Sequence, residues 1–329
     1  MWSLLPLILA VVVTLDGPAA SAAPVDVERA RFGAAVEALR GGDWREAARG
    51  FRAGVQRGGL LVDYAQFFLA ETLARQGDLA GARRIAENFP GRHPESLLAP
   101  LAVLHAAVLA SRQGDEAAVE SLLRRFLSQF GAHPEIPGAR YLLGLSLEAQ
   151  GRPLEAARTL RELWLTAPAS AYGEAAGDRL EALAGAGIAL PPPTQPERID
   201  RAERLLAGGV PTAARQEVEA LLAELPDPEL TLRGLRVMSG GWRRGGQYDV
   251  AQRAADRALT EAPRERRPSL LLDLARLQQR VGARELALGT LERLTREHPA
   301  APEVAEALLQ NGRVLEDAGR KERIERGER

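Results

Sequence analysis

The chain contains no cysteine, few aromatic residues and a single lysine, Lys321. Without cysteine it can form no disulfide, no thiolate metal site and no thiol nucleophile, and it has no N-terminal cysteine to be lipidated. Aromatic residues make up 5% of its 329 residues, whereas apolar residues make up 46%. Because the strong helix formers Ala, Leu, Glu and Arg dominate and no strand-like alternating run is present, the composition predicts an all-α protein with an ample core.

The chain also lacks an excess of one charge and any recognisable metal or phosphate motif. Its 43 basic residues balance 44 acidic residues, so nothing indicates a nucleic-acid or anionic membrane surface. The glycine-rich stretch "MSGGWRRGGQYD" lacks the preceding strand and the lysine of a phosphate loop. The four histidines have no helical metal-ligand spacing, and we interpret them as turn residues: His93, His105, His133 and His298. We therefore expect no metal, no cofactor and no catalytic residue.

The N-terminal segment indicates export. An apolar run from Leu4 to Leu15 is followed by Ala20-Ser21-Ala22, which fits a leader-peptidase site. Residues 1–23 are therefore predicted to be a signal peptide and the remainder a soluble periplasmic protein. An uncleaved anchor is the alternative, because the only basic group before the apolar run is the terminal amine.

A glycine recurs at a regular interval, which predicts a repeat. Successive turn glycines are separated by 35, 37, 37, 58, 37, 36 and 37 residues, and a period in the mid-thirties is typical of a helix-turn-helix solenoid. Each glycine is predicted to end the first helix of a hairpin in the left-handed conformation. The eight positions are Gly42, Gly77, Gly114, Gly151, Gly209, Gly246, Gly282 and Gly319.

Small residues occupy fixed positions on either side of these glycines. The residue seven positions before each glycine is Ala, Gly or Ser. The residue five positions after it is Ala in six of the eight repeats, with Val119 and Ile324 in the others. Two helices approach closely only where neither side chain is bulky, so we predict that the two columns mark the helix crossing inside each hairpin. The alanines of the second column are Ala47, Ala82, Ala156, Ala214, Ala251 and Ala287.

The stretch "YLLGLSLEAQGRPLEAARTLRELWLTAP" is similar to the tetratricopeptide-repeat consensus, and the resemblance extends over residues 28–320. It implies a right-handed solenoid of helical hairpins. The one long spacing divides the array. We predict four hairpins in residues 24–170, an extra helix and a proline-rich break in residues 171–196, and a second set in residues 197–329 whose last hairpin is incomplete.

Two longer stretches narrow the resemblance. "LLVDYAQFFLAETLARQGDLAGARRIAENFP" and the region from "LRELWLTAP" to "QEVEALL" look like the N-terminal superhelical region of soluble lytic murein transglycosylases. That resemblance implies a periplasmic scaffold that positions or assists cleavage of peptidoglycan glycan strands. The family's catalytic Glu-Ser motif and its Gly-Leu-Met-Gln stretch do not occur here, so no catalytic residue transfers.

An independent periplasmic adaptor, which binds a cell-envelope protein on the concave face, is the alternative function. The repeat pattern is lost after Gly319, and we expect a truncated reading frame there, with natural capping of the array as the alternative.

The stretch "DYAQFFLAET" is the candidate binding site on the concave face. Its two adjacent phenylalanines cannot both face the same core of one helix, so one of them contacts a neighbouring repeat or anchors a partner. The candidate binding residues are Asp63, Tyr64, Gln66, Phe67 and Glu71.

Overall fold

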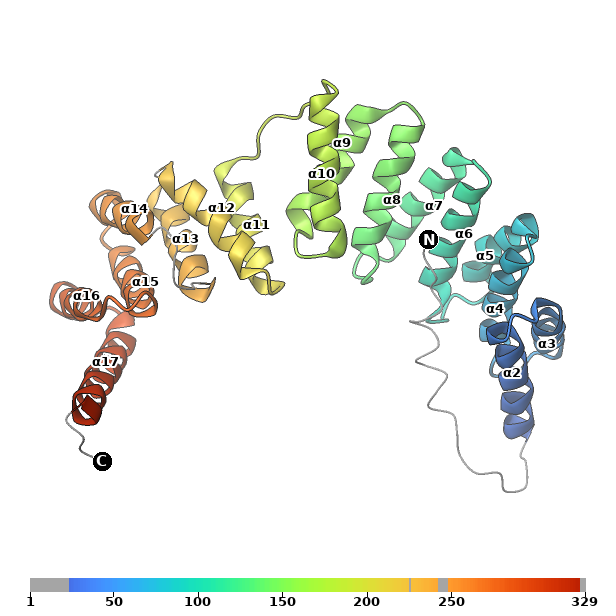
Figure 1. Cartoon of the computed structure of the whole chain (residues 1–329), viewed down its shortest axis with the longest axis horizontal. Coiled ribbons are helices and arrows are strands. Elements are labelled where there is room, and N and C mark those ends of the chain that lie inside the picture. The colour runs from blue at the N-terminus through green and yellow to red at the C-terminus, as the bar shows by residue number, and fades with distance from the viewer. Residues whose placement is uncertain (1–23, 225, 242–247, 326–329) are drawn as a thin grey trace. The chain divides into compact units, whose positions relative to one another are not determined.

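The chain is helical throughout its described part, as the composition predicts. The structure, a computed structural model, describes residues 24–224, 226–241 and 248–325 (Figure 1). Over these residues it contains sixteen α-helices, labelled α2 to α17, and no strand. The predicted signal peptide, residues 1–23, and Gly246 lie outside the described residues. No helix in the described part is long and apolar enough to cross a membrane.

The chain forms two compact units, residues Met1–Ala139 and Arg140–Arg329, which we call unit 1 and unit 2. The division falls inside helix α8 (Ile136–Ala149), whereas the predicted break at residues 171–196 lies within unit 2. Each unit is an array of helices in which sequence neighbours pack against one another.

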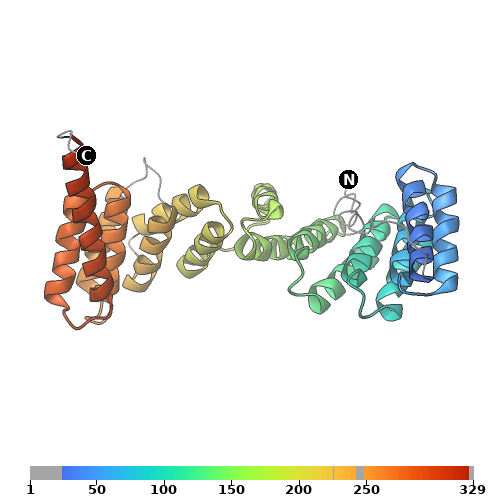
Figure 2. The same cartoon turned by 90° about the horizontal axis from the view of Figure 1, so that it is seen from below.

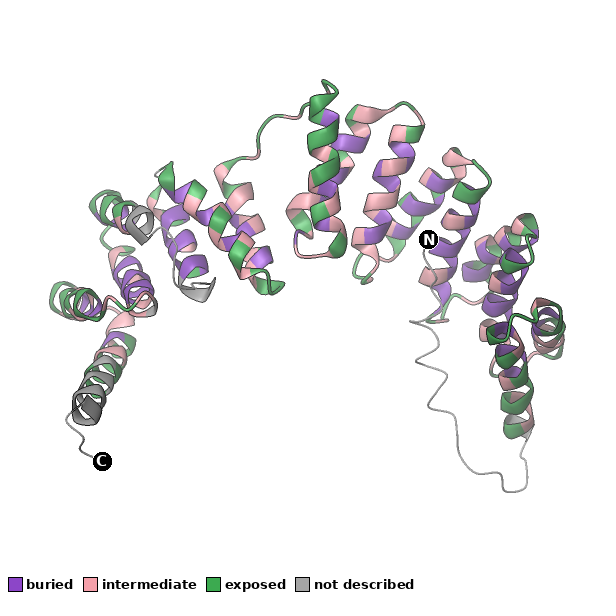
Figure 3. Cartoon of the chain, viewed as in Figure 1, coloured by how far each residue is buried: buried purple, intermediate pink, exposed green. Residues whose placement is uncertain are grey.

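Unit 1 consists of three hairpins and the start of α8. Its helices are α2 (Pro24–Arg40), α3 (Trp44–Arg57), α4 (Val62–Arg75), α5 (Leu79–Arg92), α6 (Ala99–Arg112) and α7 (Glu116–Gln129). The first helices α4 and α6 are buried on nearly all sides, because each is covered by its own partner and by a neighbouring hairpin (Figure 3). Helices that are apolar all round require such a position. The second helices α3, α5 and α7 bury only one face.

A Gly-Asp pair forms each hairpin turn of unit 1. The glycines have φ values of 80°, 89° and 73°, which lie in the left-handed region that side chains disfavour. The aspartates accept hydrogen bonds from the backbone N–H three residues ahead, at 3.0, 2.8 and 3.1 Å, and so cap the second helix. The pairs are Gly42 and Asp43, Gly77 and Asp78, and Gly114 and Asp115. Glycine thus ends one helix and aspartate begins the next.

Unit 2 contains the remaining helices. They are α9 (Pro153–Thr166), α10 (Ala171–Gly185), α11 (Gln195–Ala207), α12 (Pro211–Ala223), α13 (Pro228–Gly241), α14 (Tyr248–Glu261), α15 (Arg267–Arg280), α16 (Arg284–Glu297) and α17 (Glu303–Glu325). Helix α10 follows a complete hairpin and packs against α9 (Figures 1 and 2). The prolines at 191–193 then lead into α11, which a Thr194 and Glu197 capping box begins. Turn glycines Gly151, Gly209 and Gly282 have φ values of 73°, 80° and 84°.

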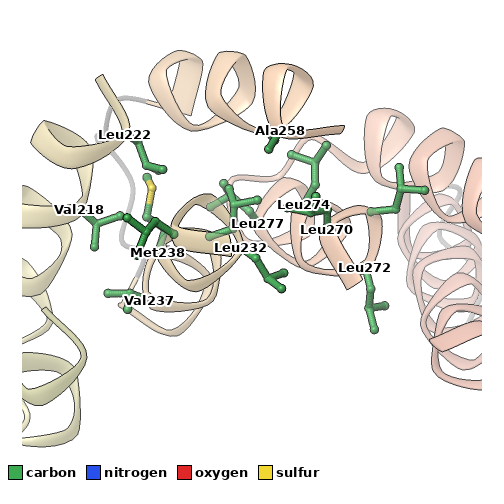
Figure 4. Close-up of a cluster of buried hydrophobic side chains, with 14 of the residues drawn as sticks. Val218, Leu222, Leu232, Val237, Met238, Ala258, Leu270, Leu272, Leu274 and Leu277 are labelled. Carbon is green, nitrogen blue, oxygen red and sulfur yellow. The ribbon is translucent and has the colours of Figure 1, made fainter. Parts of the chain in front are cut away.

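The largest core of unit 2 joins α11 to α17. Figure 4 shows Val218 and Leu222 of α12 near Met238 of α13, and Leu270 and Leu274 of α15 farther along the same cluster. All five side chains are at most 3% exposed. Burying aliphatic side chains of this size contributes about 1.5 to 3 kcal/mol each relative to leaving them in water.

Six of the eight small residues that stand seven positions before a turn glycine are buried, whereas Gly312 is exposed and the burial of Ser239 lies outside the description. The buried ones meet a different column from the one predicted. A Cβ atom built on Gly144 would lie 2.7 Å from Leu160, and one built on Gly50 would lie 2.6 Å from the Cβ atom of Ala35. The position seven before the glycine therefore faces the residue eight or nine after it. The alanines five positions after the glycine are also buried, at 0% exposure: Ala47, Ala82, Ala156, Ala214 and Ala287. The burial of Ala251 lies outside the description.

The eighth turn differs from the sequence prediction. Gly319 was predicted to end a first helix, but α17 runs from Glu303 through this residue to Glu325. The residues after Gly319 are strong helix formers, and a glycine inside a helix costs only about 0.5 to 1 kcal/mol relative to alanine. No second helix folds back over α17 within the described residues.

Candidate functional site

The residues predicted to bind a partner lie on α4 and are mostly covered. Gln66 is 5% exposed and Phe67 is 3% exposed. Asp63, Tyr64 and Glu71 are half-buried. None of the five side chains is exposed in the structure, so α4 offers little surface for a partner.

Phe67 and Phe68 are both buried, on different sides of α4. The ring of Phe67 lies 6.1 Å from that of Phe89 and 6.0 Å from that of His105, which belong to α5 and α6. The ring of Phe68 stacks on Phe51 of the preceding hairpin at 5.7 Å. Phe67 therefore contacts a neighbouring repeat, which is one of the two alternatives that the sequence leaves open.

Two polar residues of α4 join it to the following segment. The hydroxyl of Ser96 donates a hydrogen bond to Asp63 Oδ2 at 2.6 Å, and His93 Nε2 lies 3.0 Å from Gln66 Oε1. Both contacts connect the second hairpin to the loop that leads into the third. They fix the spacing of the repeats.

Glu71 and His105 form a largely covered pair, which the sequence prediction for His105 does not include. His105 was interpreted as a turn residue, but it lies in the middle of α6 and is 5% exposed. Its Nε2 atom is 3.3 Å from Glu71 Oε2, and Arg75 donates to the other oxygen of Glu71 at 2.9 Å. Burial lowers the pKa of His105, and the nearby Glu71 carboxylate opposes this only in part. The sequence contains one signal for this burial: His105 stands nine residues before a turn glycine and so inside a first helix, at the same repeat position as Asp273.

Charged side chains lie along the first helices of unit 2. Its first helices α11, α13, α15 and α17 pack in succession, and guanidinium and carboxylate groups link each helix to the next. We call this surface the unit 2 polar face. Its side chains are Asp200 and Glu203 on α11, Arg233 and Arg236 on α13, Arg276 on α15 and Glu306 on α17.

A buried carboxylate supports the centre of the unit 2 polar face. The side chain of Asp273 is 2% exposed, whereas that of Arg236 is 56% exposed. Arg236 Nε donates to Asp273 Oδ2 at 2.8 Å, and Arg276 pairs with Asp273 Oδ1. Arg276 also donates to Glu306 Oε1 at 2.6 Å. One buried anion thus orients two arginines at the surface.

The N-terminal end of the unit 2 polar face has the same alternation of charges. Arg233 donates to both oxygens of Glu203, at 2.9 and 2.6 Å, and to Asp200 at 2.5 Å. The hydrogen bond to Glu203 and then that to Asp200 raise the pKa of the guanidinium. At the opposite end, the hydrogen bond from Arg276 lowers the pKa of Glu306. Charge-assisted bonds of this kind are stronger than neutral ones and have defined directions.

Arginines also attach α11 to α9, around the extra helix. The guanidinium of Arg201 lies over the ring of Trp164 at 3.9 Å and donates to Glu217 of α12 at 2.8 Å. Arg161 reaches the proline segment through the carbonyl of Pro191. Across residues 24–224, 226–241 and 248–325, no group of three or more His, Cys, Asp or Glu side chains is placed to hold a metal ion.

Several solved structures are similar to this chain. A tetratricopeptide repeat protein from Parabacteroides merdae has 15% identity and a TM-score of 0.42, covering 86% of this chain and 98% of its own. The TPR2AB domain of yeast Sti1, solved with pHSP90, has 10% identity and a TM-score of 0.34, covering 89% and 98%. Naa15/Naa10 bound to HypK-THB has 14% identity and a TM-score of 0.38, covering 85% and 50%.

A search of curated proteins finds no match. The family model described as tetratricopeptide repeat matches residues 32–93 and 104–174. These segments contain α3 to α5, α7 to α9 and the larger part of α2 and of α6. Residues 32–93 and 104–174 therefore carry tetratricopeptide repeats.

Proposed function

We propose that this chain is a non-catalytic repeat scaffold that binds another protein along the unit 2 polar face. The observation that carries the proposal is the support of Arg236, whose exposed guanidinium rests on the buried carboxylate of Asp273. An arginine held in one orientation loses little conformational entropy when it binds, so its hydrogen bonds contribute more to affinity.

The chemistry of the face indicates a partner with charged side chains. Arg236 pairs with Asp273 and is 56% exposed, so a carboxylate of a partner can approach the same guanidinium from the solvent side. Asp200 and Glu203 are 42% and 43% exposed and can accept from a basic side chain. A segment that bears both signs of charge would complement the alternation along the face, and binding would weaken as salt is added.

A capture experiment tests this proposal. The chain is immobilised, incubated with a cell-envelope extract, and the bound proteins are quantified by mass spectrometry for the wild type, Arg236→Gln and Arg293→Gln. Arg293 is the matched control, because it is an exposed arginine in an ion pair with Glu297 on the second helix α16. We expect a stoichiometric protein with the wild type and Arg293→Gln, and a large loss with Arg236→Gln. Equal capture by all three chains would refute the role of the face.

We further propose that the scaffold acts in the periplasm, because residues 1–23 have the pattern of an export signal. Expression in a bacterium with a Sec pathway tests this: the mass of the chain recovered from the periplasm should correspond to cleavage near Ala23 or Pro24. A chain that stays in the cytoplasm at full mass would contradict it.

The resemblance to the superhelical region of lytic transglycosylases supports a second candidate, a scaffold that assists cleavage of peptidoglycan. Its test is separate from the protein capture, because the ligand is a glycan network. Retention of the purified chain on isolated sacculi, at a level above that of an unrelated protein of similar charge, would favour this candidate. Absence of retention together with a captured protein would favour the adaptor.

A further inference from the structure

Helix α17 exposes an apolar stripe, and two of its positions, those of Gly312 and Leu315, correspond to positions that most other first helices bury. Leu308 is 58% exposed and Leu315 is 57% exposed. Gly312, which lies between them in the sequence, and Ala305, which precedes them, are also exposed. Their spacing of three and four residues places them on one side of the helix. No atom lies within 4 Å of a Cβ atom built on Gly312, so the surface at this residue is open.

The register of the repeat shows what kind of element covers this stripe elsewhere. Leu315 stands four residues before Gly319. At the same position Ala38 is half-buried, and four other first helices carry residues that are at most 6% exposed: Leu73, Ala110, Leu147 and Leu205. In the hairpins α4–α5, α6–α7 and α11–α12 the second helix packs against the first. The stripe of α17 therefore has the shape and chemistry of a surface for an antiparallel helix.

One of the hairpins shows how the space beside a glycine seven residues before the turn glycine is filled. Gly144 stands seven residues before its turn glycine, as Gly312 does, and the side chain of Leu160 from the antiparallel helix α9 fills the space beside it. Gly312 would accept a leucine in the same way. Helix α17 itself supplies such a leucine four residues away, at Leu308.

We propose that α17 pairs with α17 of a second copy of this chain in an antiparallel, two-fold symmetric dimer. Leu308 of each copy lies on Gly312 of the other, and Leu315 lies on Ala305. Every large side chain of the stripe then faces a small one, so the two backbones can approach closely. A parallel pair would instead place leucine on leucine and glycine on glycine.

Symmetry and size set the expected strength of this contact. A two-fold contact is isologous, so one self-complementary stripe is sufficient for both copies. A single pair of helices buries less surface than a standard stable interface. We therefore expect a reversible dimer that dissociates on dilution in the micromolar range.

Sedimentation equilibrium of the full chain tests the proposal, with Gly312→Leu and Gly289→Leu as matched variants. Gly289 lies inside α16 on an exposed surface, and no atom lies within 4 Å of its Cβ position either. Both substitutions remove a helix glycine and add the same side chain, so both should leave the melting temperature unchanged or slightly raised. We expect a concentration-dependent dimer for the wild type and for Gly289→Leu. For Gly312→Leu we expect a dissociation constant of the dimer that is at least about tenfold higher, because the added side chain separates the helices.

A monomeric wild type at all concentrations, or a dimer that Gly312→Leu leaves unchanged, would overturn the proposal. Both outcomes are independent of the unit 2 polar face, which the capture experiment tests with another variant.

Cysteine cross-linking tests the antiparallel register in a chain that has no cysteine of its own. Ala305→Cys chains mixed with Leu315→Cys chains should form a disulfide-linked dimer on oxidation. Neither variant should cross-link alone, because ten residues of helix place its two copies about 15 Å apart, beyond the roughly 7 Å that a disulfide allows. Efficient cross-linking of Leu315→Cys alone would indicate a parallel pair and contradict the proposed geometry.

Discussion

Replacing Phe67 by alanine should destabilise the protein strongly, although this residue was a candidate partner anchor. The side chain is 3% exposed, and the rings of Phe68, Phe89 and His105 surround it at centroid distances of 5.9, 6.1 and 6.0 Å. Removing a buried phenylalanine ring typically costs about 3 to 5 kcal/mol, because the lost transfer free energy adds to that of the cavity. Rigid aromatic neighbours close such a cavity poorly, so we expect a value in the upper part of this range.

The assay is urea unfolding of Phe67→Ala followed by far-ultraviolet circular dichroism, with Leu60→Ala as the control. Leu60 is 73% exposed, and its truncation should change the free energy of unfolding by less than about 0.5 kcal/mol. Because repeat arrays can unfold in parts, hydrogen exchange in α4 and α6 should show the loss locally. A change below about 1 kcal/mol for Phe67→Ala, with protection in α4 unaltered, would refute the assignment of Phe67 to the core.

Three further changes test the packing, the buried pair and the turns. Ala156→Leu overfills a position that is 0% exposed and should cost about 1 to 3 kcal/mol, measured by thermal unfolding. Burial lowers the pKa of His105, so the folded state binds fewer protons than the unfolded state. The free energy of unfolding should therefore fall as the pH drops below about 6.5, the ordinary histidine value. Thermal unfolding between pH 8 and pH 5 should show a smaller decrease for His105→Gln than for the wild type. Gly282→Ala should lower the free energy of unfolding by about 1 to 2 kcal/mol, because the φ of Gly282 is +84°. Gly289→Ala, inside α16, should raise it by about 0.5 to 1 kcal/mol. Equal melting temperatures for these two variants would contradict the difference in backbone conformation.

Local rules in the sequence predict the repeat well, because they act within one hairpin. A glycine that must adopt positive φ and an aspartate that caps the next helix leave a visible Gly-Asp pair, as at Gly77 and Asp78. The partners of a side chain across hairpins leave no such mark. The packing of Phe67 against His105 depends on the angle between neighbouring hairpins, which the period alone does not determine. The continuation of α17 past Gly319 follows helix propensity, because within the described residues no second helix packs over this part of α17.

The two units use the same repeat positions in different ways. Nine residues before a turn glycine stand His105 in unit 1 and Asp273 in unit 2, and six residues before one stand Glu71 and Arg276. In unit 1 the ring of Phe67 lies against His105, and the pair of Glu71 and His105 connects neighbouring hairpins. In unit 2 the buried carboxylate instead supports arginines such as Arg236 at the surface. The pair of Glu71 and His105 is largely covered and offers a partner little accessible polar surface, whereas the guanidinium of Arg236 stands at the surface, where a partner can reach it. Unit 1 is therefore expected to tolerate polar surface changes without loss of binding, and unit 2 is where a single surface substitution should abolish it.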